Sequence, residues 1–238
     1  MNLFLRRLAG PAAVIAGLAA AGTGELRAEP AIGAVFQRPY LGAIGTRIDG
    51  TSEKLYFNTT VFAEETVHTG ARAGTALRFA DGTKLQVGAN STVVLDRFVY
   101  DPDGGAAEGV IRFSTGIFRF ISGKMPKDAL RLETPSATLA IRGTKFVLAV
   151  DDQGATDVWV IEGSVEAIPE TGDPATAQAG QSLVIEPGRP GVTLVNGRTA
   201  PHDPAVEDDL SFFGPPGIGD RERRSGMTGD GNRGGNNN

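Results

Sequence analysis

The chain has 238 residues, of which 40% are hydrophobic, and its formal net charge is −5. It contains no cysteine, which excludes disulfides, thiol catalysis and thiolate metal ligands. An acidic chain also lacks the basic surface with which proteins bind nucleic acids and anionic lipids, so neither is expected as a partner.

The first 28 residues have the three-part pattern of a secretory signal peptide. Arg6 and Arg7 precede an apolar run over residues 8–22, and a polar stretch ends at Ala28. The run is about 15 residues long, short of the ~20 that span a bilayer. We expect cleavage after Ala28, with Ala21 as the alternative position and an uncleaved anchor as the alternative interpretation.

Cleavage would leave a more acidic chain. Removal of residues 1–28 takes away three arginines and one glutamate, so the net charge becomes −7. No later stretch of the sequence has the length and hydropathy of a membrane span. We therefore predict a periplasmic protein with no span after cleavage.

The main part of the sequence is rich in short β-favouring runs. Residues 29–53 are Gly-rich and predict a flexible lead-in, whereas residues 54–200 hold apolar runs separated by Gly, Asn, Asp and Pro. Turn signals recur about every 8–12 residues, and no run keeps a helical period. We predict a single all-β domain of many short strands, built as a sandwich or as a β-solenoid or roll.

Two runs, residues 145–150 and 158–161, are apolar at every position. Such runs are typical of central strands that are covered on both faces, so Trp159 is expected to be buried.

The Asp81-Gly82 turn has two interpretations. A two-residue loop would pair Phe79 with Lys84 and turn apolar side chains to water, because a one-residue slip inverts every side chain. A three-residue loop instead pairs Leu77 with Leu85 and gives Gly82 the left-handed position of a bulged turn. We prefer the three-residue loop, although it sets Arg78 opposite Lys84.

The C-terminal region divides into two segments with different predicted structure. Residues 201–216 predict a short helix and cap, because Asp203 can cap, Pro204 suits the first helical position, and Val206 and Leu210 share a face. Residues 217–238 consist of polar residues and Gly with almost nothing apolar, which predicts a disordered tail.

The polar residues give little indication of a metal site. His68 and His202 have neither a Cys nor a second His at ligand spacing, so both are expected as surface residues. The segment Asp101–Gly104 fails the calcium-loop template at its third and last ligands, and it predicts a turn.

Nor do the acids and serines indicate an enzyme. Glu64 and Glu65 would point to opposite faces of a strand, and Asp151-Asp152 lies in a predicted hairpin loop. No serine occupies a Gly-x-Ser-x-Gly elbow. We predict no catalytic residue, no metal and no cofactor.

Arg142 lies between Ile141 and Gly143, just before the most apolar run. A buried guanidinium must satisfy five donors, so we expect Arg142 to pin a bend by donating to backbone carbonyls and to Glu133 or Glu162. Ligand binding by Arg142 is the alternative.

Six segments, in this order, resemble the FecR-domain family: Phe79–Ser91, Leu95–Pro102, Gly116–Gly123, Thr134–Thr144, Val160–Glu166 and Ala179–Ser182. The fourth is the strongest match. The motif residues expected to matter, in the fold first and in binding second, are Asp81, Gly82, Thr83, Thr134, Pro135, Arg142, Gly143, Thr144, Glu162 and Gly163.

The resemblance implies an all-β domain that binds partners in the periplasm. The family is named for a regulator of iron-citrate uptake, whose periplasmic part receives a signal from an outer-membrane transporter and passes it inward to a sigma factor. We predict a non-catalytic, periplasmic FecR-like interaction module in envelope signalling, whose partner is an envelope protein or glycan. The alternatives are a structural or accessory subunit of an envelope or export assembly, and an unrecognised hydrolase.

Overall fold

The computed structural model describes residues 30–37 and 42–201. Within these ranges the chain is almost entirely β-structure, with one 3₁₀ turn, η1 (Lys127–Ala129). The strands are β1 (Ala31–Val35), β2 (Ala43–Thr46), β3 (Ser52–Leu55), β4 (Thr60–Phe62), β5 (Glu65–Thr69), β6 (Thr75–Phe79), β7 (Lys84–Val87), β8 (Thr92–Tyr100), β9 (Ala107–Ile121), β10 (Leu130–Glu133), β11 (Ala137–Val150), β12 (Thr156–Pro169), β13 (Ala175–Gln178), β14 (Gln181–Ile185) and β15 (Thr193–Asn196).

Several predicted features lie outside the described residues. These are the signal peptide (1–28), the C-terminal helix and cap beyond Pro201, the tail (217–238) and His202. Within residues 30–37 and 42–201, no helix has the length and hydropathy of a membrane crossing.

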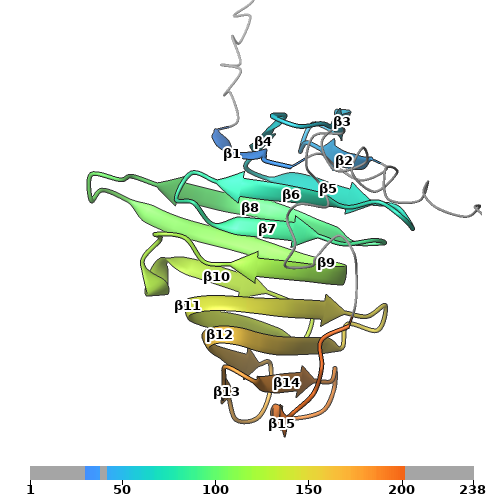
Figure 1. Ribbon diagram of the computed structural model, residues 1–238, viewed down its shortest axis with the longest axis vertical. Helices are drawn as coiled ribbons and strands as arrows, with labels where there is room; N and C mark the ends of the chain where they lie inside the picture. The colour runs from blue at the N-terminus through green and yellow to red at the C-terminus, as the bar shows by residue number, and fades with distance from the viewer. Residues whose placement is uncertain (1–29, 38–41, 202–238) are drawn as a thin grey trace, which may run out of the picture.

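All 15 strands belong to one sheet, which the pairing divides into two layers. Layer 1 runs through β4, β1, β6, β7, residues 116–121 of β9, residues 145–150 of β11, residues 156–160 of β12, β14 and β15. Layer 2 runs through β3, β2, β5, β8, residues 107–115 of β9, β10, residues 137–142 of β11, residues 164–169 of β12 and β13. The strands stack along the long axis of the molecule, from β1–β4 at one end to β13–β15 at the other (Figure 1).

The three longest strands belong to both layers because they bend. β9 bends next to Gly116, β11 at Gly143 (φ 57°) and β12 at Gly163 (φ 74°). A positive φ is a conformation that glycine adopts without a Cβ clash. The β11–β12 register also shifts between Arg142 and Lys145, as at a β-bulge. The fold therefore combines the facing layers of a sandwich with the continuous bent strands of a roll.

The inward side chains of both layers form the hydrophobic core. Phe113 of layer 2 meets Phe118 of layer 1 with 4.8 Å between ring centroids, and Phe120 stacks on Phe146 at 5.3 Å. Burial of each such side chain contributes about 1.5–3 kcal/mol to stability. The Phe113–Phe118 contact therefore joins the two layers, whereas Phe120 and Phe146 pack side by side within layer 1.

The three-residue interpretation of the Asp81-Gly82 turn is confirmed. Leu77 lies opposite Leu85, and the Phe79 amide donates to the Thr83 carbonyl at 2.9 Å. Gly82 has a φ of 89°, as the bulged turn requires.

The turn also brings Arg78 opposite Lys84, as predicted. Both cations lie over the Phe36 ring, with the Arg78 Cζ 4.7 Å and the Lys84 Nζ 5.7 Å from its centroid. Attraction to the ring face offsets the repulsion between the two charges.

The prediction of central strands at residues 145–150 and 158–161 is also confirmed. Within layer 1, β11 lies between β9 and β12, and β12 lies between β11 and β14. Trp159 is 6% exposed. Ile161, at the bend of β12, is exposed.

The prediction of a flexible lead-in over residues 29–53 is wrong. β1 pairs with β4 and β6, and β2 pairs with β3 and β5, so this part of the chain extends both layers. One of its glycines serves close packing, because a Cβ on Gly33 would lie 2.5 Å from the Arg78 carbonyl oxygen. Gly33 therefore permits the close approach of β1 to β6.

Candidate functional site

The Asp81-Gly82-Thr83 motif forms a buried hydrogen-bonded turn. The Asp81 carboxylate accepts from the Thr83 amide at 2.8 Å, the Thr83 hydroxyl at 2.7 Å and the Met125 amide at 3.0 Å. The Thr83 hydroxyl in turn accepts from the Gly123 amide at 3.0 Å. Asp81 and Thr83 are both buried, so this turn fixes the β6–β7 hairpin to the loop after β9.

The Arg142-Gly143-Thr144 motif lies beside the same loop. The Thr144 amide donates to the Ser122 hydroxyl, and the Ser122 amide donates to the Thr144 carbonyl, both at 2.9 Å. Across the bend, a Cβ on Gly163 would lie 2.3 Å from the Gly143 carbonyl oxygen. The bends of β11 and β12 therefore pack directly against each other.

Eight of the ten predicted motif residues thus lie at one end of the layers, termed the motif corner. They are Asp81, Gly82, Thr83, Arg142, Gly143, Thr144, Glu162 and Gly163. A cavity of about 160 Å³ lies at this corner, and its lining includes Thr83, Gly123, Leu130, Ile141 and Gly143.

Thr134 and Pro135 lie elsewhere. They lie just before the first residue of β11, far from its bend at Gly143. There the Thr156 hydroxyl donates to the Thr134 hydroxyl at 2.9 Å. Pro135 adjoins Gly154 of the β11–β12 hairpin loop. The five residue steps from Ala137 to Arg142 span about 17 Å of strand, so these two residues do not join the motif corner.

The prediction that Arg142 is a buried strut is wrong, because Arg142 is exposed. Its expected partners are engaged elsewhere: Glu133 accepts from Arg112 at 2.8 Å, and Glu162 lies 3.9 Å from the Lys145 ammonium. Within the part of the chain that the structure describes, the Arg142 side chain has no hydrogen bond or ion pair. Ile141 points inward, so the next side chain along the strand points outward.

Arg142 borders a shallow depression of about 400 Å³ on the outer side of layer 2. β11, β12 and β13 bring its floor together, because Ala140 lies opposite Glu166 and Glu166 lies opposite Thr176. Ser164 lies opposite Arg142 itself. Asp128, from η1, completes the lining. The depression thus offers one unpaired guanidinium beside two carboxylates and two hydroxyls, a mixed set suited to a polar partner.

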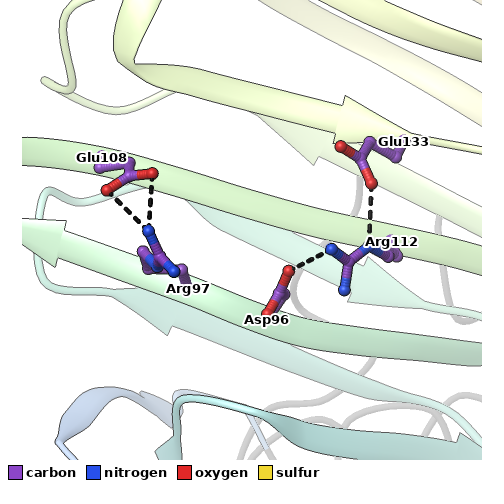
Figure 2. Close-up of polar contacts among 5 residues, drawn as sticks. All are labelled: Asp96, Arg97, Glu108, Arg112 and Glu133. Atoms are coloured by element: carbon purple, nitrogen blue, oxygen red, sulfur yellow. Dashed lines mark hydrogen bonds and ion pairs between the residues drawn. The ribbon is translucent and has the colours of Figure 1, made fainter.

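Two other arginines on this side of layer 2, Arg97 and Arg112, are already paired (Figure 2). Arg97 donates to both Glu108 oxygens, at 2.9 and 3.1 Å, and Arg112 bridges Asp96 on β8 and Glu133 on β10. The hydrogen bond to Glu108 raises the pKa of Arg97 above its ordinary value. Such exposed pairs contribute only about 0–1 kcal/mol each to stability. Their guanidinium groups are nevertheless occupied, unlike that of Arg142.

Sequence reasoning missed the residues that complete the depression. Asp128, Ser164, Glu166 and Thr176 come from three different elements, and no local motif connects them. The orientation of Arg142 did have a signal: Ala137, Leu139 and Ile141 alternate with polar or small residues, which places Arg142 on the outer side.

The predictions for His68, for the Glu64-Glu65 pair and for the turn at Asp101–Gly104 agree with the structure. His68 is exposed, with its Nδ1 3.0 Å from the Thr92 hydroxyl, and Glu64 is exposed whereas Glu65 is buried. Asp101–Gly104 forms a turn in which the Asp103 amide donates to the Asp101 carboxylate. Among residues 30–37 and 42–201, no group of three or more His, Asp or Glu side chains is arranged to hold a metal ion.

Comparison with known proteins gives one family and two solved structures. The family model described as FecR protein matches residues 65–166. Two crystal structures of a candidate anti-sigma factor from Parabacteroides distasonis ATCC 8503 are 13% identical to the chain, with TM-scores of 0.45 and 0.44. Each match covers 55% of this chain and 59% of the other. No curated protein matches the chain.

The family match spans the residues that build the motif corner. It begins at β5, includes the Asp81-Gly82-Thr83 turn, and ends within β12 just after Gly163. The resemblance drawn from the sequence segments is therefore confirmed over residues 65–166, which contain the first five of the six segments and match the family model described as FecR protein.

Proposed function

We propose that this protein is a non-catalytic, periplasmic interaction module that binds an envelope protein through the depression beside Arg142. The FecR family match supports a module related to signalling. The finer assignment rests on one observation: Arg142, a motif residue, is exposed and unpaired among the described residues, at the edge of a 400 Å³ depression.

The chemistry of the depression favours binding. A guanidinium that protrudes from a rigid strand can form a two-pronged hydrogen bond with a carboxylate, and it needs no rearrangement to do so. β11 is held on both sides by β10 and β12, and the adjoining bend is fixed by Thr144 and Ser122. An acidic side chain or chain terminus of a protein partner would suit this position, and a glycan is the second ligand class.

The two alternative functions would each require a different arrangement of residues on this surface. A structural or accessory subunit of an envelope assembly would also use an exposed face, but through a permanent contact. A hydrolase would need two facing carboxylates across a cleft. Glu166 and Asp128 share the depression, but they line an open surface on the outside of a sheet.

Affinity capture from the native periplasm tests the proposal. The mature protein should be recovered there with an N-terminus at or near Glu29, and it should retain a partner that the Arg142→Ala variant fails to retain. Arg72→Ala is the matched control, since Arg72 is also exposed but lies in the turn before β6. Intact chain in the membrane fraction would contradict export, and equal capture by wild type and Arg142→Ala would contradict the binding surface.

A further inference from the structure

The outer side of layer 1 carries a row of buried side chains, termed the layer 1 row. Neighbouring members lie opposite one another on adjacent strands, in the order Ala76, Gln86, Arg119, Val147, Trp159 and Ser182. All six are between 1% and 6% exposed. This face lies on the opposite side of the molecule from the depression beside Arg142, so the row belongs to a different surface.

Such burial is not expected on a sheet face that is open to solvent. Outward positions of layer 2, such as His68, Arg112, Arg131 and Ala140, are exposed. The strands of layer 1 already face the core with their other side, through residues such as Phe118 and Phe146. An antiparallel sheet with one solvated face alternates buried and exposed residues. The layer 1 row therefore lies beneath a cover.

The cover must offer polar groups as well as apolar ones. Both side-chain amide atoms of Gln86, the Nε1 of Trp159 and the hydroxyl of Ser182 are buried without a hydrogen-bond partner among the described residues. Buried amide, indole and hydroxyl groups are almost always hydrogen-bonded in folded proteins. Three strands of layer 1, β7, β12 and β14, thus present donors and acceptors without a hydrogen-bond partner on one face.

The described chain leads onto this face at its C-terminal end. The Arg198 guanidinium lies 5.1 Å from the centroid of the Trp159 ring and donates to Asp157 at 2.7 Å. Pro201, three residues after Arg198, is the last residue that the structure describes, and the coloured chain in Figure 1 stops there. The last described residues therefore include Arg198, which lies over the Trp159 ring.

We propose that residues 202–216 of this same chain dock on the layer 1 row. Val206, Leu210 and Phe213 are spaced so that a helix would present them on one apolar face. From Trp159 to Gln86 the row crosses three strand spacings, about 14 Å, and a helix over residues 204–213, ahead of Gly214 and Pro215, would reach about 15 Å. The segment is therefore long enough to cover the row from Trp159 to Gln86.

The charges of the two surfaces are complementary. Residues 202–216 contain four acids, Asp203, Glu207, Asp208 and Asp209, and no Lys or Arg. The outer side of layer 1 carries Arg78, Lys84, Arg119 and Arg198 on or beside the row. Polar backbone and carboxylate groups from the segment would also meet the buried donors of Trp159 and Ser182.

The chain itself provides a clean probe, because Trp159 is its only tryptophan and it has no cysteine. A nitroxide label on Ser211→Cys in the full mature chain should quench most of the Trp159 emission, because a docked segment holds the label close to the indole. The same label on Asn237→Cys, in the predicted tail, should not quench it. Each is compared with a diamagnetic label at the same position.

A second measurement separates this segment from other covers. The variant Val206→Asp/Leu210→Asp should shift the Trp159 emission to the red and make it more accessible to acrylamide, whereas deletion of residues 217–238 should change neither. Equal quenching by the labels at 211 and 237, or an unchanged emission in the double variant, would overturn the proposal. The cover would then be another part of the chain or a separate molecule.

Discussion

At the scale of single residues, Asp81 and Arg142 belong to the same motif corner but face opposite environments. The Asp81 carboxylate is buried and accepts hydrogen bonds from three donors, whereas Arg142 reaches solvent from the outer side of β11. A buried carboxylate with this geometry stabilises the fold. An exposed guanidinium that has no partner within residues 30–37 and 42–201 adds little stability there, and we propose that it binds another molecule.

Replacement of the Asp81 carboxylate by an amide should be costly. In Asp81→Asn, either orientation of the amide sets its NH₂ against a donor, which is the Thr83 amide on one side and the Met125 amide on the other. We expect a loss of about 2–3 kcal/mol in the free energy of unfolding, measured by urea denaturation. Arg142→Met is the control and should change stability by less than about 0.5 kcal/mol. An Asp81→Asn variant as stable as wild type would show that the network contributes nothing.

At the scale of elements, the bends of the long strands decide the architecture. Each of β9, β11 and β12 contributes to both layers, so a single sheet encloses the core. The sequence indicated the individual runs correctly, because alternation and turn residues are local signals. The apolar runs over residues 145–150 and 158–161 indicated only the layer 1 parts of β11 and β12, since a strand that bends and continues has the same pattern as two strands joined by a turn. Only the pairing across layers distinguishes the two.

The contact between the two bends can be measured by a matched pair of substitutions. Gly143 and Gly163 both have a positive φ, but a Cβ on Gly143 would meet nothing within 4 Å, whereas one on Gly163 would collide with the Gly143 carbonyl. Gly143→Ala should cost only the left-handed strain, about 1–2 kcal/mol. Gly163→Ala should cost at least about 3 kcal/mol, since the backbone must also separate. Equal losses in urea denaturation would mean that the bends do not restrain each other.

At the scale of the whole molecule, the layers have two outer sides with different uses. The outer side of layer 2 is exposed and carries the depression beside Arg142, whereas the outer side of layer 1 carries the buried layer 1 row. The sequence could predict an all-β chain and the FecR resemblance, but not this asymmetry, because the depression and the layer 1 row each combine residues from several strands. The lead-in was misjudged for a related reason: Ile32, Val35 and Ala43 are too few to show a period, yet all are buried in the core.

The central claim is that the surface around Arg142, within the region that matches the FecR model, binds a partner in the envelope. Site-specific photo-cross-linking in living cells tests it most directly, with the reactive residue at Ala140, which is exposed on the floor of the depression. The same residue at Gln153, in the hairpin loop at the other end of β11, is the control. We predict a discrete adduct from position 140, none from position 153, and loss of the adduct when Arg142 is changed to Ala. The absence of any adduct from position 140, or an adduct that persists in the Arg142→Ala variant, would contradict the claim.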